Sequence, residues 1–196
     1  MTFARRRQHT LAETDIGALL NSLSGLLSAA VPRTVQFEMS VPETLHTCVV
    51  DRSELDTALL NLVVNARDAM PSGGQIYVAA CNRSLKAKDP LLPSGLQPGN
   101  WVEISVRDTG TGMPPELQAR IFEPFFTTKG DGKGTGLGLA MVHGFIYQSG
   151  GFLTLDSALG KGTTFSLFLP AADRERANEN GSQPVTIGSI LNPRAA

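Results

Sequence analysis

Asp108-Thr-Gly-Thr-Gly112 and Gly134-Thr-Gly-Leu-Gly138, with the run Ile121-Phe-Glu-Pro-Phe-Phe126 between them, form the stretch of this sequence that decides its fold. Glycine alone tolerates the positive φ and the close backbone approach that a phosphate or a purine edge demands. The first cluster follows a predicted strand, and the second opens a predicted helix. Two such clusters in this order predict a domain that encloses a nucleotide.

The composition limits the class of protein. The chain has 196 residues, of which 41% are hydrophobic and 18% charged, with a formal net charge of −1. This length suits one well-buried domain. A charge near zero attracts neither nucleic acid nor an anionic membrane, so we expect neither as a partner. No apolar run approaches the roughly 18 to 20 residues that span a bilayer. Cys48 and Cys81 lie in apolar runs, as small core residues of a reducing, cytoplasmic compartment would.

Hydrophobic periodicity predicts both helices and strands. Apolar residues recur at the helical period over 15–30, and Ser53 is expected to cap a second long helix that reaches about Met70. Alternating apolar residues and turn residues predict the remaining elements. These are strands over 34–39, 47–50, 75–81, 101–107, 152–156 and 163–169, a polar surface loop over 83–100, and helices over 115–121 and 135–149.

A polar stripe marks the second long helix. Asn61, Asn65 and Asp68 stand at i, i+4 and i+7 and therefore share one helical face. Such a stripe is normally a solvated face. Asparagine is nevertheless a poor helix former, and its oxygen suits a phosphate-bound Mg²⁺ that keeps most of its waters. The stripe alone leaves both interpretations open.

Asp108 ends a predicted strand and precedes two glycines. Asp-x-Gly is ordinary turn chemistry. The alternative is a buried carboxylate that accepts a hydrogen bond from an exocyclic amine, such as the N6 amine of adenine. A site built in that way rejects a base that presents a carbonyl at the same place.

The second glycine cluster directly precedes an apolar helix. Its backbone N–H groups and the helix dipole would meet a polyphosphate. The cluster is neither a Walker A loop, which continues with Lys-Ser/Thr, nor a dinucleotide-binding fingerprint, which follows a strand. Lys129 and Lys133 flank it and would either neutralise phosphate charge or remain solvated.

Together these motifs resemble the nucleotide-binding boxes of the GHKL superfamily, and specifically the catalytic, ATP-binding domain of bacterial sensor histidine kinases of the nitrogen-regulation or hybrid type. The resemblance covers about residues 15 to 170. The matching boxes are Asn61-Leu-Val-Val-Asn65-Ala-Arg-Asp-Ala-Met, Asp108-Thr-Gly-Thr-Gly-Met113, Phe122-Glu-Pro-Phe-Phe126, Gly134-Thr-Gly-Leu-Gly-Leu-Ala-Met141 and Gly160-Lys-Gly-Thr-Thr-Phe165.

The resemblance implies an α+β fold, a two-layer α/β sandwich in which a mixed sheet backs three helices and ATP is held in the Bergerat manner. It implies that Asn65 ligates Mg²⁺, that Asn61, Asn65 and Lys129 serve catalysis, and that Asp108 contacts the adenine amine. The ATP-binding residues that it implies are Asn61, Asn65, Asp68, Asp108, Gly110, Gly112, Met113, Phe122, Thr128, Lys129, Lys133, Gly134, Thr135, Gly136, Leu137, Gly138, Leu139 and Thr163.

Position 61 distinguishes kinases from ATP-hydrolysing relatives. Members that hydrolyse ATP place a glutamate four residues before the metal asparagine to activate water. Asn61 occupies that position and cannot act as a general base, and Glu54 and Asp56 lie one to two helical turns earlier. The resemblance therefore implies a domain that binds ATP, hydrolyses it poorly and delivers the γ-phosphate to another acceptor.

In this family the acceptor is a histidine on a helical hairpin about 100 residues before the asparagine box. His9, His46 and His143 do not stand in that setting. We therefore expect a piece of a longer kinase, with residues 1–14 ending the hairpin, 15–172 forming the catalytic domain, and 173–196 forming a disordered tail or a linker to a receiver domain. The implied partners are the hairpin and a response-regulator receiver domain. The fragment is expected to be monomeric and the full-length kinase homodimeric.

Two rival functions share the fold. An anti-sigma-type serine kinase would label serine, although the complete box at Phe122–Phe126 argues against it. A degenerate nucleotide-sensing or docking module would label nothing, although the intact glycines and both asparagines argue against such decay.

Overall fold

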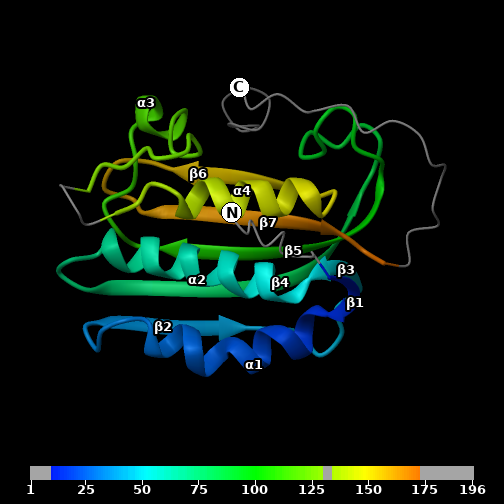
Figure 1. Ribbon diagram of the computed structural model, residues 1–196, viewed down its shortest axis with the longest axis horizontal. Coiled ribbons are helices and arrows are strands. Elements are labelled where there is room, and N and C mark those ends of the chain that lie inside the picture. The colour runs from blue at the N-terminus through cyan, green and yellow to red at the C-terminus, as the bar shows by residue number, and fades with distance from the viewer. Residues whose placement is uncertain (1–9, 130–133, 173–196) are drawn as a thin grey trace, which may run out of the picture.

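The computed structural model of the chain describes residues 10–129 and 134–172, which form two layers (Figure 1). One layer is a mixed sheet of five strands in the order β2-β4-β5-β7-β6, and three helices, α1, α2 and α4, cover one of its faces. The predicted α+β sandwich is confirmed. The strands are β1 (Leu11–Asp15), β2 (Val35–Ser40), β3 (Thr47–Asp51), β4 (Gly74–Leu85), β5 (Gly99–Asp108), β6 (Phe152–Ser157) and β7 (Thr163–Pro170). The helices are α1 (Ile16–Ala29), α2 (Arg52–Asp68), α3 (Pro115–Gln118) and α4 (Gly138–Gln148).

The strand pairing brings distant motifs together. β2 is parallel to β4, so the chain between them must cross a face of the sheet, and α2 lies in that connection. The other neighbours in the five-stranded sheet are antiparallel. In the β5–β7 register Asp108 stands opposite Thr163. Asp108 of the first glycine box (108–113) and Thr163 of the last box (160–165) are therefore fixed side by side.

The apolar faces of α1 and α2 pack on the sheet, as their periodicity predicts. The buried residues are Ile16, Leu19, Leu20, Leu23 and Leu27 of α1 and Leu55, Ala58, Leu59, Leu62, Val63 and Ala66 of α2. Because this face of α2 is committed to the core, Asn61, Asn65 and Asp68 are left on a different side of the helix.

The start of α2 differs from the sequence prediction. Asp51 is the N-cap, and its Oδ1 accepts hydrogen bonds from the backbone N–H groups of Ser53 at 2.9 Å and Glu54 at 3.3 Å. Ser53 instead donates its hydroxyl to the same oxygen at 2.7 Å. The prediction of Ser53 as the cap was wrong because a better-placed capping carboxylate stands two residues earlier.

The predicted loop over 83–100 is shorter than expected. β4 continues to Leu85 and β5 begins at Gly99, so the connection between them covers only residues 86–98. This connection is not purely polar, because three of its leucines pack on an apolar cluster of Leu85, Trp101, Phe152 and Phe168. Those leucines are Leu91, Leu92 and Leu96. The predicted helices over 115–121 and 135–149 are also shorter, since α3 ends at Gln118 and α4 begins at Gly138.

Residues 11–15 form a strand that the sequence analysis did not predict. β1 pairs antiparallel with β3, and the N–H of Thr10 donates to Asp51 Oδ2 at 2.9 Å. Residues 1–9 and 173–196 lie outside the described residues, so the assignment of the chain's ends to a hairpin and a tail remains a prediction.

Both cysteines are free, but only Cys48 is buried in the core; Cys81 is half-buried on the opposite face of the sheet, so its assignment as a core residue was wrong. Over the described ranges, no helix combines the length and apolar character needed to cross a bilayer.

Candidate functional site

A cavity of about 620 Å³ opens where the C-terminal end of α2, the end of β5 and the start of α4 meet. It gathers most of the residues that the sequence analysis proposed for ATP. The proposed residues that line it are Asn61, Asn65, Asp68, Asp108, Gly112, Met113, Thr128, Lys129, Gly134, Thr135, Gly136, Gly138, Leu139 and Thr163. Motifs separated by up to about half the chain therefore contribute to one site.

Asp108 provides a buried acceptor at one end of the cavity. The residue is only 4% exposed, and its Oδ1 accepts hydrogen bonds from the N–H groups of Gly110 at 2.8 Å and Thr163 at 3.2 Å. Burial raises the pKa of Asp108 above its ordinary value, although these two hydrogen bonds act in the opposite direction. Oδ2 accepts no hydrogen bond from any described residue and is left for a donor in the cavity. Asp108 therefore makes the local hydrogen bond of an Asp-x-Gly turn and is also a buried carboxylate, while its contact with an adenine amine stays a prediction.

Two glycines let the backbone close around Asp108. Gly112 has a φ of +63°, and a Cβ there would lie 1.9 Å from the carbonyl oxygen of Ala158. Gly162 has a φ of +81°, and a Cβ there would lie 2.1 Å from the carbonyl oxygen of Asp108 itself. The turn between β6 and β7 thus packs directly on the strand end that carries the carboxylate.

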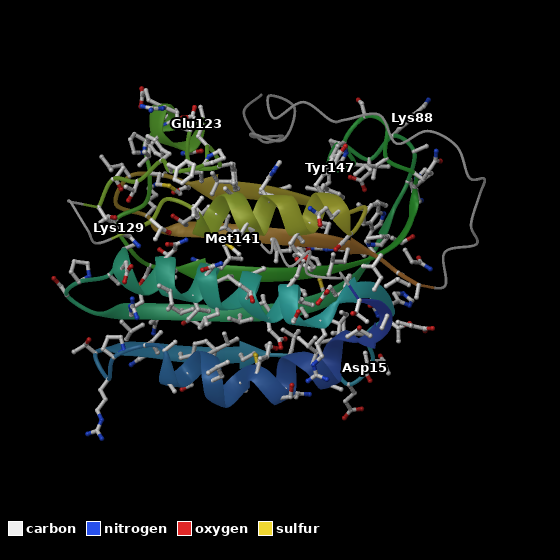
Figure 2. The ribbon with its side chains drawn as sticks, in the orientation of Figure 1. Asp15, Lys88, Glu123, Lys129, Met141 and Tyr147 are labelled. Atoms are coloured by element: carbon white, nitrogen blue, oxygen red, sulfur yellow. The ribbon has the colours of Figure 1, made fainter. Side chains whose placement is uncertain are left out.

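The polar stripe of α2 forms another side of the cavity. Lys129 reaches this stripe from the segment that follows the box at Phe122–Phe126, called the aromatic box below (Figure 2). Its Nζ donates to Asp68 Oδ2 at 2.5 Å and to Asn65 Oδ1 at 3.4 Å. Arg67 contacts the other carboxylate oxygen of Asp68 at 2.7 Å. Burial alone would raise the pKa of Asp68, but the hydrogen bonds and charges of Lys129 and Arg67 together lower it.

The second glycine box is held against both the aromatic box and α2. Gly136 has a φ of +65°, and a Cβ there would lie 2.3 Å from the backbone carbon of Phe125. The N–H of Phe125 donates to the carbonyl of Gly136 at 3.0 Å. At Gly138 a Cβ would lie 3.4 Å from Asn61 Oδ1. The N-terminal end of α4, where backbone N–H groups lack helical partners, therefore lies beside Asn61 of the α2 stripe and borders the cavity.

Some proposed binding residues do not line the cavity. Gly110 lies behind it, where a Cβ would lie 2.7 Å from the carbonyl oxygen of Ala69, so this glycine is required for packing on the end of α2. Leu137 is the N-cap residue of α4. Phe122 is buried, with its ring centroid 5.5 Å from that of His143. Lys133 lies outside the described residues.

The three histidines take no part in the cavity as described. His143 is half-buried against Phe122, and burial lowers its pKa. His46 lies between β2 and β3, where its backbone N–H donates to Asn82 Oδ1 at 2.9 Å. His9 precedes the described residues. The expectation that none of the three histidines is the phosphate acceptor stays a prediction.

The sequence analysis missed the apolar wall of the cavity. The cavity-lining residues that it did not propose as binding residues are the apolar Val64, Ala66, Ala69, Leu117, Ile121, Phe126 and Phe165, together with the polar Arg67, Thr111 and Thr127. Most of them belong to the recognised boxes or to their immediate neighbours, so proximity to a box was the available signal. Their residue types alone do not distinguish a ligand-facing side chain from a core one.

The donors of the cavity fit a divalent cation that is held mainly by its ligand. Within the described ranges, no group of three or more His, Cys, Asp or Glu residues lies together as a protein-built metal centre would require. Asn65 Oδ1 nevertheless already accepts a hydrogen bond from the cationic Lys129. A single amide oxygen beside a carboxylate suits Mg²⁺ that arrives with phosphate oxygens and waters in its shell.

A mixed sheet with helices on one face, a buried carboxylate at one end of a cavity, and an amide stripe facing a glycine loop at the other define a Bergerat-type nucleotide-binding domain. Residues 50–173 match the family described as histidine kinase-, DNA gyrase B-, and HSP90-like ATPase. The chain belongs to this family of ATP-binding domains.

The chain is similar to sensor kinases among proteins of known function. It is 42% identical over 176 residues to the sensor kinase CckA of Brucella abortus, and the aligned region covers 90% of this chain and 19% of CckA. It is 37% identical over 161 residues to the sensor histidine kinase ZraS of Escherichia coli K12, and the aligned region covers 82% of this chain and 31% of ZraS. The chain therefore spans between about a fifth and a third of these relatives.

Two solved structures with the same fold are a full-length histidine kinase and the catalytic domain of another. Full-length ShkA in complex with AMPPNP superposes with a TM-score of 0.65 at 31% identity, over 84% of this chain and 32% of ShkA. The nucleotide-free catalytic domain of histidine kinase ThkA superposes with a TM-score of 0.64 at 26% identity, over 83% of this chain and 96% of that domain.

Proposed function

We propose that this domain binds ATP with Mg²⁺ and positions the γ-phosphate for transfer to a histidine on a helical hairpin of a longer sensor kinase. The observation that carries this proposal is the single cavity that joins the available Oδ2 of Asp108 to the Asn61–Asn65–Asp68 stripe and the second glycine box. The AMPPNP named for the related ShkA structure supports an adenine nucleotide as the ligand.

Each end of the cavity has a distinct task in this proposal. Asp108 accepts the exocyclic amine of adenine and disfavours bases with a carbonyl at that position. The N–H groups at the start of α4 and the ammonium of Lys129 receive the phosphates. Asn65 holds Mg²⁺, which would neutralise charge on the phosphates. Because phosphoryl transfer asks little covalent chemistry of the protein, orientation and charge neutralisation account for catalysis.

The partners follow from the same proposal. The acceptor hairpin and a response-regulator receiver domain belong to other parts of the signalling system, since the histidines of this chain lack the acceptor setting. The names of the relatives, sensor kinase and sensor histidine kinase, support a two-component role over the anti-sigma rival. On this basis the isolated chain is monomeric and dimerisation resides in the hairpin.

Calorimetric titration with AMPPNP and Mg²⁺ tests the first half of the proposal, and incubation with ATP and a separately prepared histidine hairpin tests the second. Adenine-selective binding followed by acid-labile labelling of the hairpin is the expected result. Labelling of serine would favour the anti-sigma rival. Absence of binding at millimolar nucleotide would refute the proposal and favour the docking module.

A further inference from the structure

The side chain of Gln118, at the end of α3, joins two segments behind the cavity wall. Its Nε2 donates to the carbonyl of Met113 at 2.8 Å and to the carbonyl of Ser157 at 2.9 Å. Both hydrogens of the amide are therefore used. Gln118 itself does not line the cavity, but Met113 and Leu117, on either side of the contact, do.

The hydroxyl of Ser157 continues this connection into the cavity. Its Oγ accepts the N–H of Met113 at 2.9 Å, and it lies 3.1 Å from the carbonyl of Gly162 and 3.0 Å from the hydroxyl of Thr163. Donation by Ser157 to Gly162 and by Thr163 to Ser157 would satisfy all three contacts at once. The β6–β7 turn and the first glycine box are thereby fastened to each other.

The chain of hydrogen bonds ends on the carboxylate that is proposed to read the base. The N–H of Thr163 donates to Asp108 Oδ1 at 3.2 Å, and both residues are at most 5% exposed. The orientation of the carboxylate therefore depends on the position of β7, which Ser157 and Gln118 help to fix. In contrast, Asn65 and Lys129, at the phosphate end, take part in none of these contacts.

We propose that Gln118 is a positioning residue for the adenine end of the site, which acts through Met113, Ser157 and Thr163 to hold Asp108 in the orientation that selects adenine. This inference rests on the proposed nucleotide function and adds a specificity determinant outside the recognised boxes. A glutamine is suited to this role because only a side-chain NH₂ group can serve two backbone carbonyls without bringing a charge into a half-buried place.

The test compares Gln118→Leu and Gln118→Glu with the matched changes at Gln97, an exposed glutamine in the connection between β4 and β5. Leucine keeps the bulk and removes both donors, whereas glutamate sets carboxylate oxygens against two carbonyls. Each variant is titrated with ATP, with inosine triphosphate, which has a carbonyl in place of the amine, and with Mg²⁺-tripolyphosphate, which has no base. Thermal unfolding without ligand establishes that each variant is folded.

We expect both Gln118 variants to bind ATP about tenfold more weakly, as the loss of two hydrogen bonds would allow. Their preference for ATP over inosine triphosphate should also fall, while their affinity for Mg²⁺-tripolyphosphate stays within about twofold of the wild-type value. Both Gln97 variants should match the wild type for all three ligands.

Two results would overturn the inference. One is an unchanged preference for ATP in both Gln118 variants. The other is an equal loss of affinity for ATP and tripolyphosphate, which would show that Gln118 supports only the fold. If the wild-type domain itself fails to bind ATP, the proposed function fails first, so that the two failures are distinguishable.

Discussion

The turn between β6 and β7 contains a pair of glycines that separates backbone strain from steric contact. Gly160 and Gly162 have similar positive φ values, +75° and +81°. A Cβ at Gly160 would meet no atom within 4 Å, whereas a Cβ at Gly162 would lie 2.1 Å from the carbonyl oxygen of Asp108. Alanine at either position incurs the same left-handed strain, but only alanine at Gly162 pushes against the strand end that carries the carboxylate.

The difference in cost follows from these distances. Left-handed backbone costs an L-residue about 1 to 2 kcal/mol, which is the whole expected loss of unfolding free energy for Gly160→Ala. At Gly162 the distance from the new Cβ to the carbonyl oxygen of Asp108 must increase by most of an ångström, and the atoms that it meets belong to the backbone of Asp108 and Thr109. Overpacking of this kind costs about 1 to 3 kcal/mol more, so we expect about 2 to 5 kcal/mol for Gly162→Ala.

ATP affinity should differ between Gly160→Ala and Gly162→Ala more clearly than their unfolding free energies do. Displacement of β7 from β5 lengthens the hydrogen bond from Thr163 to Asp108, and a hydrogen bond to a charged group contributes about 1.5 to 3 kcal/mol. Urea titration would measure the unfolding free energies, and calorimetry below the unfolding transition would measure ATP affinity. Gly162→Ala should weaken ATP binding at least about tenfold, while Gly160→Ala leaves it unchanged. Equal effects of the two substitutions on stability and on affinity would refute the steric reasoning.

Three further changes test the charged groups. Asp108→Asn should turn an acceptor in the cavity into a donor and weaken ATP binding at least about tenfold in calorimetry, while urea titration finds unfolding free energy unchanged or higher, because burial already opposes the charge. Lys129→Met should cost less than about 1 kcal/mol of unfolding free energy in urea, because Lys129 and Asp68 are 34% and 27% exposed at their side chains. The hydrogen bond from Ser53 holds the pKa of Asp51 below its ordinary value of 3.8, so its contribution is present above that value and is lost as the pH falls through the lower folded-state pKa. Asp51→Asn should therefore show a shallower loss of stability than the wild type in urea titrations between pH 7 and pH 3.

The family resemblance implied the layers of the fold, and local spacing predicted that the polar groups of α2 share one face. Asn61, Asn65 and Asp68 line the cavity since a helix places i, i+4 and i+7 on one side, whatever that helix packs against. Asp108 lies beside Thr163 because the strands that carry them are paired, and the family resemblance implied that both bind ATP.

The features that the sequence did not predict depend on tertiary neighbours. β1 has an almost fully exposed side-chain pattern with little alternation, and it is a strand because β3 offers it an edge with which to pair. Asp51 and Ser53 are both favoured capping residues, so only the end of β3 decides between them. No motif in the sequence points to Gln118, because its proposed role depends on the carbonyls of Met113 and Ser157, which the fold brings within hydrogen-bond distance.

The carboxylates of the cavity determine whether the domain could hydrolyse bound ATP. Among the described residues that line it, the carboxylates are Asp68 and Asp108. Asp108 lies at the end proposed for the base, away from the phosphates. Asp68 is near the proposed phosphates, but the hydrogen bonds from Lys129 and Arg67 lower its pKa and make it a poorer base. Glu54 lines a separate hollow between α2 and α4. With Asn61 in the place of a catalytic glutamate and Asp68 engaged by two cations, we expect slow hydrolysis of bound ATP, so that the γ-phosphate waits for an external nucleophile.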